Sequence, residues 1–324
     1  MKGIVRHEYG SADDVLELAN MDMPVVGEDE VLVRIEAAGV NMADVDYLLG
    51  RPSFARLGTG LRTPKDKRLG LDLAGQVERV GNKVTRLRPG DEVFGDLTDY
   101  GFGAFAEYAC AHEDAFALKP TNMTMEQAAV IPQAGVMALQ GMRLKRRIEP
   151  GDKVLINGAG GNVGPFAVQI AKSYGAEVTG VDRSTKLDML REIGADHVID
   201  YAKEDFTRNG QRYDRILDVA AFRTISDYKR AMSPNGVYIA IPGTLRGVFR
   251  SMLVGPLSSL FSGRKMGMLP WAPFKLEDVA ILTGLVEDGS VTPVIDRRYP
   301  LSEIADALRY QDQGHPPGKI VITA

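Results

Sequence analysis

The sequence predicts an α/β protein made of a β-rich domain and a second domain with a doubly wound parallel sheet. Up to about residue 123, short runs alternate apolar and polar residues between glycines, as half-buried strands and turns do. From Thr124 onward, apolar runs of strand length alternate with stretches of helical spacing, which is typical of a parallel sheet covered by helices. A length of 324 residues also exceeds what one compact core usually covers, so we expect two domains.

The composition is that of an ordinary globular protein, with 44% hydrophobic and 25% charged residues. A formal net charge of -4 gives no electrostatic reason to expect nucleic acid as a partner. The single cysteine, Cys110, excludes an intramolecular disulfide and a thiolate-rich metal cluster. The amino terminus lacks an apolar signal region, and no run of about 18 apolar residues occurs. We therefore expect a cytoplasmic protein that does not span a membrane.

Strand patterns occur at both ends of the chain. Residues 30–40 and 72–81 alternate with a period of two, and 88–95 places Pro-Gly-Asp before a short apolar strand. Residues 294–324 supply a further strand, a helix and a last strand, with Ser302 as the expected N-cap of that helix.

The alternating region opens with a helix whose Thr124 and Gln127 have the spacing of a capping box. The strands expected after it are 153–157, 177–181, 197–200, 215–219 and 236–241. The helices expected between them are 163–174, 185–193 and 223–232. Apolar strands joined in this way by helices predict parallel neighbours.

Four glycines follow the first of these strands and open the next helix: Gly158, Gly160, Gly161 and Gly164. Glycine permits tight turns and a close approach of phosphate to the backbone, and a helix N-terminus offers unpaired N–H groups to an anion. Asn162 and Val163 would contribute such N–H groups. The spacing is G-x-x-G-x-x-G at positions 158, 161 and 164 rather than G-x-G-x-x-G. Within a strand–turn–helix–strand unit it predicts a site for a dinucleotide pyrophosphate, and the alternative is a merely tight turn.

The end of the second strand leaves the choice of dinucleotide open. Asp182 lies 18 residues after Gly164, where an acid would accept hydrogen bonds from an unphosphorylated ribose, which favours NAD. Arg183, Ser184 and Lys186 follow at once and would suit a 2′-phosphate, which favours NADP. The alternative for these basic residues is a solvated start of a helix.

Several motifs in order resemble those of the medium-chain dehydrogenase/reductases, in their zinc-independent quinone oxidoreductase-like branch. They are "RPGDEVFG", "GAFAEY", "GAGGNVGPFAVQIAK", "GADHVIDY" and "GHPPGKIVIT". The resemblance implies a GroES-like catalytic domain formed by 1–123 and 271–324, and a Rossmann domain over 124–270. It implies a coenzyme, NADPH being favoured over NADH, that reduces a small hydrophobic quinone or α,β-unsaturated carbonyl by hydride transfer.

The resemblance also bears on zinc. Zinc-dependent members of the superfamily carry cysteine, histidine and glutamate where this chain has Asn41, Leu71 and Asp72. Catalytic zinc needs about three protein ligands, so we expect no metal. A metal-free site needs positioned hydrogen-bond donors for the developing oxyanion and a source of a proton.

The family motif assigns three catalytic candidates. Asn41 would hold the nicotinamide ribose or donate to the substrate carbonyl, and its alternative is a turn residue. Tyr47 is a candidate proton donor, although many relatives carry their tyrosine one position earlier, at Asp46. Asp44 matches an acidic position of the family, and its alternative is a structural role in the turn.

Five further contacts with the coenzyme follow from the resemblance. They are Tyr201 on the adenosine side, Val219, Pro242 and Gly243 along the nicotinamide, and Lys319 near the phosphates. The alternatives are an ordinary aromatic at a strand end for Tyr201 and a solvated lysine at a strand edge for Lys319. Relatives often pair through the edge of the Rossmann sheet, so we expect a homodimer.

The segment 244–271 is unusually apolar for a connection. It predicts a buried helix followed by the last strand of the sheet. Two alternatives are a lid over a wide hydrophobic pocket and a peripheral contact with a membrane. Two other functions stay open for the whole chain: a dinucleotide-binding protein with a structural or interaction role and little turnover, and an enoyl-thioester reductase.

Overall fold

The computed structural model describes residues 1–241 and 263–323, and the chain forms two compact units. The first unit comprises Met1–Val136, Pro273–Thr283 and Pro293–Ala324, and the second comprises Met137–Ala272 and Gly284–Thr292. The first is β-rich and the second has a parallel sheet, so the predicted fold class is confirmed. The domain limits predicted from the sequence, at 123/124 and 270/271, stay a prediction.

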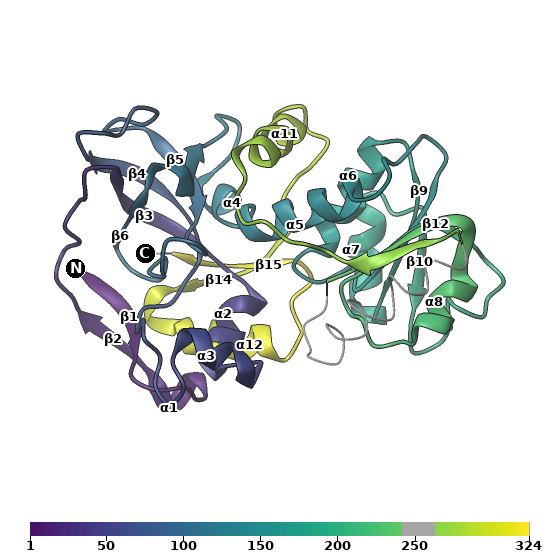
Figure 1. Cartoon of the computed structure of the whole chain (residues 1–324), viewed down its shortest axis with the longest axis horizontal. Helices are drawn as coiled ribbons and strands as arrows, with labels where there is room; N and C mark the ends of the chain where they lie inside the picture. The colour runs from purple at the N-terminus through teal and green to yellow at the C-terminus, as the bar shows by residue number, and fades with distance from the viewer. Residues whose placement is uncertain (242–262, 324) are drawn as a thin grey trace. The chain divides into compact units, whose positions relative to one another are not determined.

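The first unit is built on a seven-stranded sheet of order β14-β15-β3-β4-β5-β7, with β6 paired to β3 (Figure 1). Its strands are β3 (Glu30–Val40), β4 (Asp72–Val80), β5 (Glu92–Asp96), β6 (Tyr108–His112), β7 (Phe116–Leu118), β14 (Ile295–Pro300) and β15 (Lys319–Thr323). A separate pair joins β1 (Lys2–Arg6) and β2 (Leu16–Asn20). The two ends of the chain meet in the larger sheet, because β15 pairs antiparallel with β3.

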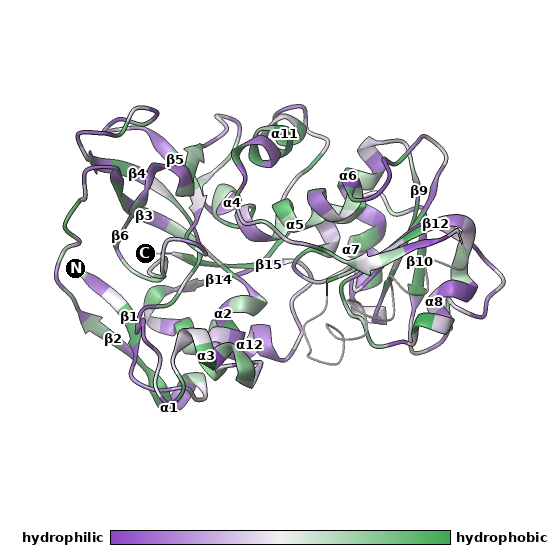
Figure 2. Ribbon diagram, in the orientation of Figure 1, coloured by the Kyte–Doolittle hydropathy of each residue, from purple (hydrophilic) through white to green (hydrophobic). Residues whose placement is uncertain are grey.

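Hydropathy separates the two carboxy-terminal strands of this sheet (Figure 2). β15 reads KIVIT, is almost wholly buried and is coloured largely as hydrophobic. β14 reads IDRRYP, lies at the edge of the sheet and leaves its arginines exposed. Charged side chains on an edge strand oppose pairing with another chain.

The first unit also contains short helices. They are α1 (Ala12–Val15), α2 (Met42–Leu49), η1 (Ser53–Ala55), α3 (Arg56–Thr59), η2 (Glu113–Ala115), α4 (Met125–Ala129), η5 (Leu301–Glu303) and α12 (Ile304–Asp312). The capping box of Thr124 is confirmed by two reciprocal hydrogen bonds with Gln127, of 3.0 and 3.2 Å. The N-cap expected at Ser302 is wrong, because Ser302 lies within η5 and Glu303 caps α12.

Two longer helices, α5 (Pro132–Arg143) and α11 (Leu276–Glu287), contain residues of both units. The helix predicted to open at Thr124 is short, because α4 stops at Ala129 and a second helix, α5, begins at Pro132. Proline cannot donate to the preceding turn, so it restarts the helix as its first residue.

The second unit has a six-stranded sheet of order β10-β9-β8-β11-β12-β13, parallel throughout. Its strands are β8 (Lys153–Asn157), β9 (Glu177–Asp182), β10 (His197–Asp200), β11 (Tyr213–Asp218), β12 (Met232–Ala240) and β13 (Lys265–Met268). Its short helices are α6 (Gly164–Ser173), η3 (Ser184–Lys186), α7 (Leu187–Glu192) and α8 (Ile225–Ala231). The strand order reverses between β8 and β11, which makes their carboxyl ends the switch point of the sheet.

The predicted strands of this sheet are confirmed, with β8 and β10 at the expected limits and β12 beginning four residues earlier. The last strand expected from the segment 244–271 is β13. Residues 244–262, on which the helix, lid and membrane interpretations depend, lie outside the described residues.

Candidate functional site

The glycine-rich turn joins β8 to α6, as predicted. Gly158 has φ 83°, a left-handed value that favours glycine. A Cβ on Gly164 would lie 2.1 Å from the carbonyl oxygen of Ala159, so only glycine fits where the helix begins. Val163 caps α6, and Pro165 lies in its first turn, where a missing N–H costs little. The N–H groups of Gly158, Gly160 and Gly161 donate within the protein, to the Val181 carbonyl, the Asp182 carboxylate and the Gly158 carbonyl.

The turn lies at the switch point of the sheet. A Cβ on Gly158 would lie 3.4 Å from the backbone nitrogen of Ala220, so the turn is packed against the loop that follows β11. Val219 begins that loop, and its N–H donates to the carbonyl of Asn157 at 2.9 Å. Dinucleotides bind across the carboxyl ends of the strands at such a reversal. The structure therefore brings the glycines and Val219 together at the expected edge.

Asp182 ends β9 and is bound to this turn. One carboxylate oxygen, Oδ2, accepts the N–H of Gly160 at 2.8 Å, and Oδ1 accepts the N–H of Arg183 at 2.8 Å. The side chain is 8% exposed. Its carboxylate is thus committed to backbone donors and stabilises the turn.

The other residues predicted for the adenosine side surround this strand end. Asp200 of β10 lies opposite Asp182 in the register of the two parallel strands. The N–H of Tyr201 donates to the Asp182 carbonyl at 3.2 Å. The Tyr201 side chain is 50% exposed. Lys186 is only 4% exposed and packs against Gly160, so the solvated alternative does not apply to it. Arg183 and Ser184 open η3 next to them.

In the first unit, Asn41 belongs to a buried polar cluster. It caps α2, and its N–H donates to Oδ2 of Asp44 at 2.8 Å. The ammonium of Lys319 donates to Oδ1 of Asn41 and lies 3.9 Å from Oδ2 of Asp72. The four side chains are at most 2% exposed. The solvated alternative for Lys319 is therefore wrong.

Burial dominates the electrostatics of this cluster. It raises the pKa of Asp44 to about 7 and raises the pKa of Asp72 well above its usual range, although the charge of Lys319 lowers both. Burial likewise raises the pKa of Asp96 and lowers the pKa of Lys319. One cation cannot neutralise three carboxylates, so the cluster holds protons near neutral pH. The Asn41 amide favours ionised Asp72, but its Nδ2 makes no hydrogen bond of normal geometry to the described residues.

Tyr47 lies on α2, one helical turn after Asp44. Its ring is half-buried and meets the ring of Phe102 edge-on, with centroids 4.7 Å apart. Burial, with the nearby Asp44 charge, raises the pKa of the Tyr47 phenol. A raised phenol pKa keeps the proton that a donor must carry, and the role itself stays a prediction.

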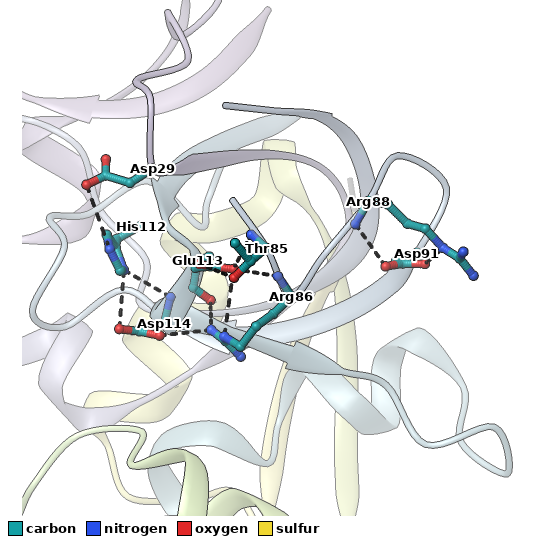
Figure 3. Close-up of polar contacts among 8 residues, drawn as sticks. All are labelled: Asp29, Thr85, Arg86, Arg88, Asp91, His112, Glu113 and Asp114. Atoms are coloured by element: carbon teal, nitrogen blue, oxygen red, sulfur yellow. Dashed lines mark hydrogen bonds and ion pairs between the residues drawn. The ribbon is translucent and has the colours of Figure 1, made fainter. Parts of the chain in front are cut away.

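The residues do not fit a zinc site. Leu71 and Asp72, at the positions of the zinc ligands, are wholly buried, and Leu71 is apolar. Among residues 1–241 and 263–323, no three histidine, cysteine, aspartate or glutamate side chains converge to hold a metal. On the surface, His112 lies between the acids Asp29 and Asp114 (Figure 3). There Asp29 and Asp114 lie 3.8 and 3.5 Å from different ring nitrogens, as exposed ion pairs.

That surface group has a structural role instead (Figure 3). Glu113 accepts the backbone N–H groups of Thr85 and Arg86 at 3.2 and 2.9 Å, and Arg86 also pairs with Asp114 at 2.9 Å. These bonds fasten the loop between β4 and β5 to η2. None of the predicted site residues belongs to the group.

Two of the predicted contacts cannot be placed, and two buried polar residues were not predicted. Pro242 and Gly243 lie outside the described residues. Sequence reasoning missed Asn157 and Asp218, the last residues of β8 and β11, which are buried and hydrogen-bonded to each other. The available signal was a polar residue at the end of each apolar strand.

Within the described ranges, no helix has the length and apolarity needed to cross a bilayer.

Comparison with family models gives two matches. Residues 27–121 match the alcohol dehydrogenase GroES-like domain, and residues 193–322 match the model described as zinc-binding dehydrogenase.

Curated relatives cover almost the whole chain. It is 32% identical to a 2-methylene-furan-3-one reductase of Solanum lycopersicum and 32% identical to an NADPH-dependent alkenal/one oxidoreductase of Arabidopsis thaliana. Each match covers 99% of this chain and 79% of the relative. It is also 30% identical to quinone-oxidoreductase QR1 of Triphysaria versicolor, over 99% of this chain and 98% of that protein.

Solved structures agree with these matches. The quinone oxidoreductase of Coxiella burnetii superposes with a TM-score of 0.87 at 28% identity, covering 100% of this chain and 99% of that one.

Proposed function

The chain belongs to the medium-chain dehydrogenase/reductase superfamily, among its quinone and alkenal oxidoreductases, and we propose that it is an NAD(P)H-dependent enzyme that reduces quinones or α,β-unsaturated carbonyls. The observation that carries this proposal is the glycine-rich turn at the switch point between β8 and β11. The printed activities of the relatives, alkenal/one and quinone reduction, supply the substrate class.

When bound, the coenzyme supplies the hydride. The chain's own task is to hold the diphosphate against the start of α6, for which we propose the N–H groups of the turn. The proposed donors are the N–H groups of Asn162, Val163 and Gly164, whereas Gly158, Gly160 and Gly161 shape the turn, because their own N–H groups donate within the protein. Val219, Pro242 and Gly243 are proposed to line the nicotinamide side.

We propose Asn41 as the donor that stabilises the developing oxyanion or holds the nicotinamide ribose. The ammonium of Lys319 can only donate, so it fixes Oδ1 of Asn41 toward itself and leaves the NH₂ end, which also interacts with Asp72, as the donor. Tyr47 is proposed as the proton donor, and Asp44 as the residue that holds the first turn of α2. A hydrogen-bond donor takes the place that a metal has in the zinc enzymes, so no zinc is needed.

For the coenzyme we propose NADPH in preference to NADH. Both Asp182 oxygens bond to backbone N–H groups, which lowers their repulsion toward a 2′-phosphate. Arg183, Ser184, Lys186 and Tyr201 surround the same strand end and can pair with the phosphate. Binding titrations with both coenzymes test this choice. We expect Arg183→Ala to weaken NADPH binding by about ten-fold or more and to leave NADH binding unchanged.

The matched control is Arg191→Ala, an exposed arginine on α7. Asp182→Ala should weaken the binding of both coenzymes, because the turn loses the hydrogen bond from the Gly160 N–H to this carboxylate. If neither Asp182→Ala nor Arg183→Ala alters the preference, this account of the strand end is wrong.

Turnover tests the function itself. Purified protein is expected to oxidise NADPH in the presence of a quinone or an enal, at a rate unaffected by EDTA. No turnover across a broad panel of acceptors would contradict the proposal and favour a structural or interaction role. A strict requirement for a long acyl thioester would identify an enoyl-thioester reductase instead.

We also propose a homodimer. Among the described strands, β13 is a sheet edge with one partner, β12. An unpaired edge can pair with its copy in a second subunit. Light scattering should then give twice the chain mass of 35.3 kDa. A mass of one chain at micromolar concentration would refute the dimer.

A further inference from the structure

A carboxylate lies buried at the switch point of the parallel sheet. Asp218 is the last residue of β11 and is 0% exposed. Its Oδ1 accepts the side-chain amide of Asn157 at 2.8 Å and the N–H of Ala221 at 2.7 Å. Its Oδ2 accepts the hydroxyl of Tyr238 at 2.8 Å.

The three donors come from different parts of the second unit. Asn157 ends β8 just before the glycine-rich turn, Tyr238 lies on β12, and Ala221 lies in the loop after β11. Ala221 has φ 50°, a left-handed value that is unfavourable for a residue other than glycine or asparagine. Its hydrogen bond to Asp218 holds the loop in that conformation. The loop is the one that packs on Gly158.

The donors to Asp218 are neutral groups. No lysine, arginine or histidine of the described ranges forms an ion pair with it. Three hydrogen bonds to the two oxygens satisfy the carboxylate, but they do not cancel its charge. A buried negative charge therefore remains where the sheet presents its dinucleotide-binding edge.

We propose that Asp218 is a positioning residue that fixes the loop after β11, and that its charge makes the site bind oxidised coenzyme more tightly relative to reduced coenzyme. The proposal rests on the proposed function, since it concerns the same coenzyme site. The oxidised nicotinamide ring carries a positive charge and the reduced ring is neutral. A fixed anion nearby favours the first over the second, which strengthens hydride donation: the hydride leaves with two electrons for the electron-poor carbon of the acceptor, and the ring keeps the positive charge.

Two substitutions separate charge from position. Asp218→Asn removes the charge, while its carbonyl oxygen still accepts from Asn157 and Ala221 and its NH₂ group faces the Tyr238 hydroxyl, which can accept. Tyr238→Phe is the matched control, because it removes one hydrogen bond and keeps the charge. Dissociation constants of NADP⁺ and NADPH are measured for each protein by calorimetry and by nicotinamide fluorescence, with thermal unfolding as a check of the fold.

For Asp218→Asn we expect NADP⁺ binding to weaken several-fold relative to NADPH binding, because the variant loses the attraction of the anion for the positively charged ring. For Tyr238→Phe we expect the ratio of the two constants to stay at its wild-type value. An unchanged ratio in Asp218→Asn, with both coenzymes still bound, would overturn the inference alone. If the wild-type protein binds neither coenzyme, the proposed function fails and the inference fails with it.

Discussion

The burial of the Asp44 carboxyl predicts how the free energy of unfolding depends on pH. Its side chain is 0% exposed, one oxygen accepts the Asn41 N–H, and Oδ1 has no hydrogen-bond partner among the described residues. Ionisation therefore places a poorly compensated charge in the core, and burial raises the pKa of this group from 3.8 to about 7. The neutral acid is the form that the fold accommodates.

Proton linkage gives the direction in which the stability changes with pH. Between pH 4 and pH 7 the folded chain holds a proton on Asp44 that the unfolded chain has released, so stability falls as the pH rises. The contribution is fully present below the unfolded pKa and is lost once the pH passes the folded pKa. A shift of about 3 units corresponds to a loss on the order of 4 kcal/mol, at ~1.4 kcal/mol per unit.

Asp44→Asn removes this titration and keeps an oxygen for the Asn41 N–H. We expect the variant to gain about 4 kcal/mol relative to the wild type between pH 4 and pH 8. The charge of Asp44 also raises the pKa of Asp72, so the variant removes this coupling as well, which changes the difference in the same direction. Urea unfolding followed by circular dichroism measures it. The fluorescence of the single tryptophan, Trp271, reports the second unit separately.

An exposed control is Asp22→Asn, which should leave the pH dependence of the wild type unchanged. A difference between Asp44→Asn and wild type that is flat from pH 4 to pH 8, or that favours the wild type as the pH rises, would refute the reasoning.

Three further predictions concern the two units. Gly164→Ala places a Cβ 2.1 Å from the Ala159 carbonyl oxygen, so NADPH affinity in a fluorescence titration should fall by about ten-fold or more; unchanged affinity would show that the turn does not hold the coenzyme. Lys319→Met leaves Asp72 buried without its cation and should cost about 3–5 kcal/mol in thermal unfolding, with partial recovery when Asp72→Asn is added; equal instability of both variants would contradict the ion pair. Burial raises the pKa of the Cys110 thiol to about 12, so iodoacetamide at pH 8 should label the folded protein far more slowly than the unfolded one, and equal rates would contradict this.

The parallel sheet was predictable because its signals are local. The strands β8 and β10 have the limits that their apolar runs and flanking glycine or acidic residues indicate. The glycine-rich turn was also readable, because tight backbone approach leaves few alternatives to glycine, as the contact between Gly164 and Ala159 shows. The N-cap predicted at Ser302 was wrong because a 3-10 turn, η5, occupies this position and α12 begins after it.

The buried clusters could not be read from spacing. Lys319 bonds to Asn41 across 278 residues of sequence, because β15 pairs with β3. A lysine after a glycine near a chain end is usually solvated, and only the pairing of the strands buries it. Asp218 looked like the polar end of an ordinary strand, and its three donors come from separate elements.

Transfer of deuterium tests the central claim most directly. The protein is incubated with an enone and NADPH that carries deuterium on the transferable position of nicotinamide C4, in the presence of EDTA. Mass spectrometry and NMR of the product are predicted to find the deuterium on the former β-carbon, with a proton from solvent on the neighbouring carbon. A reduced product with no deuterium at that carbon, or deuterium transfer that stops when EDTA is added, would contradict direct metal-free hydride transfer at this site.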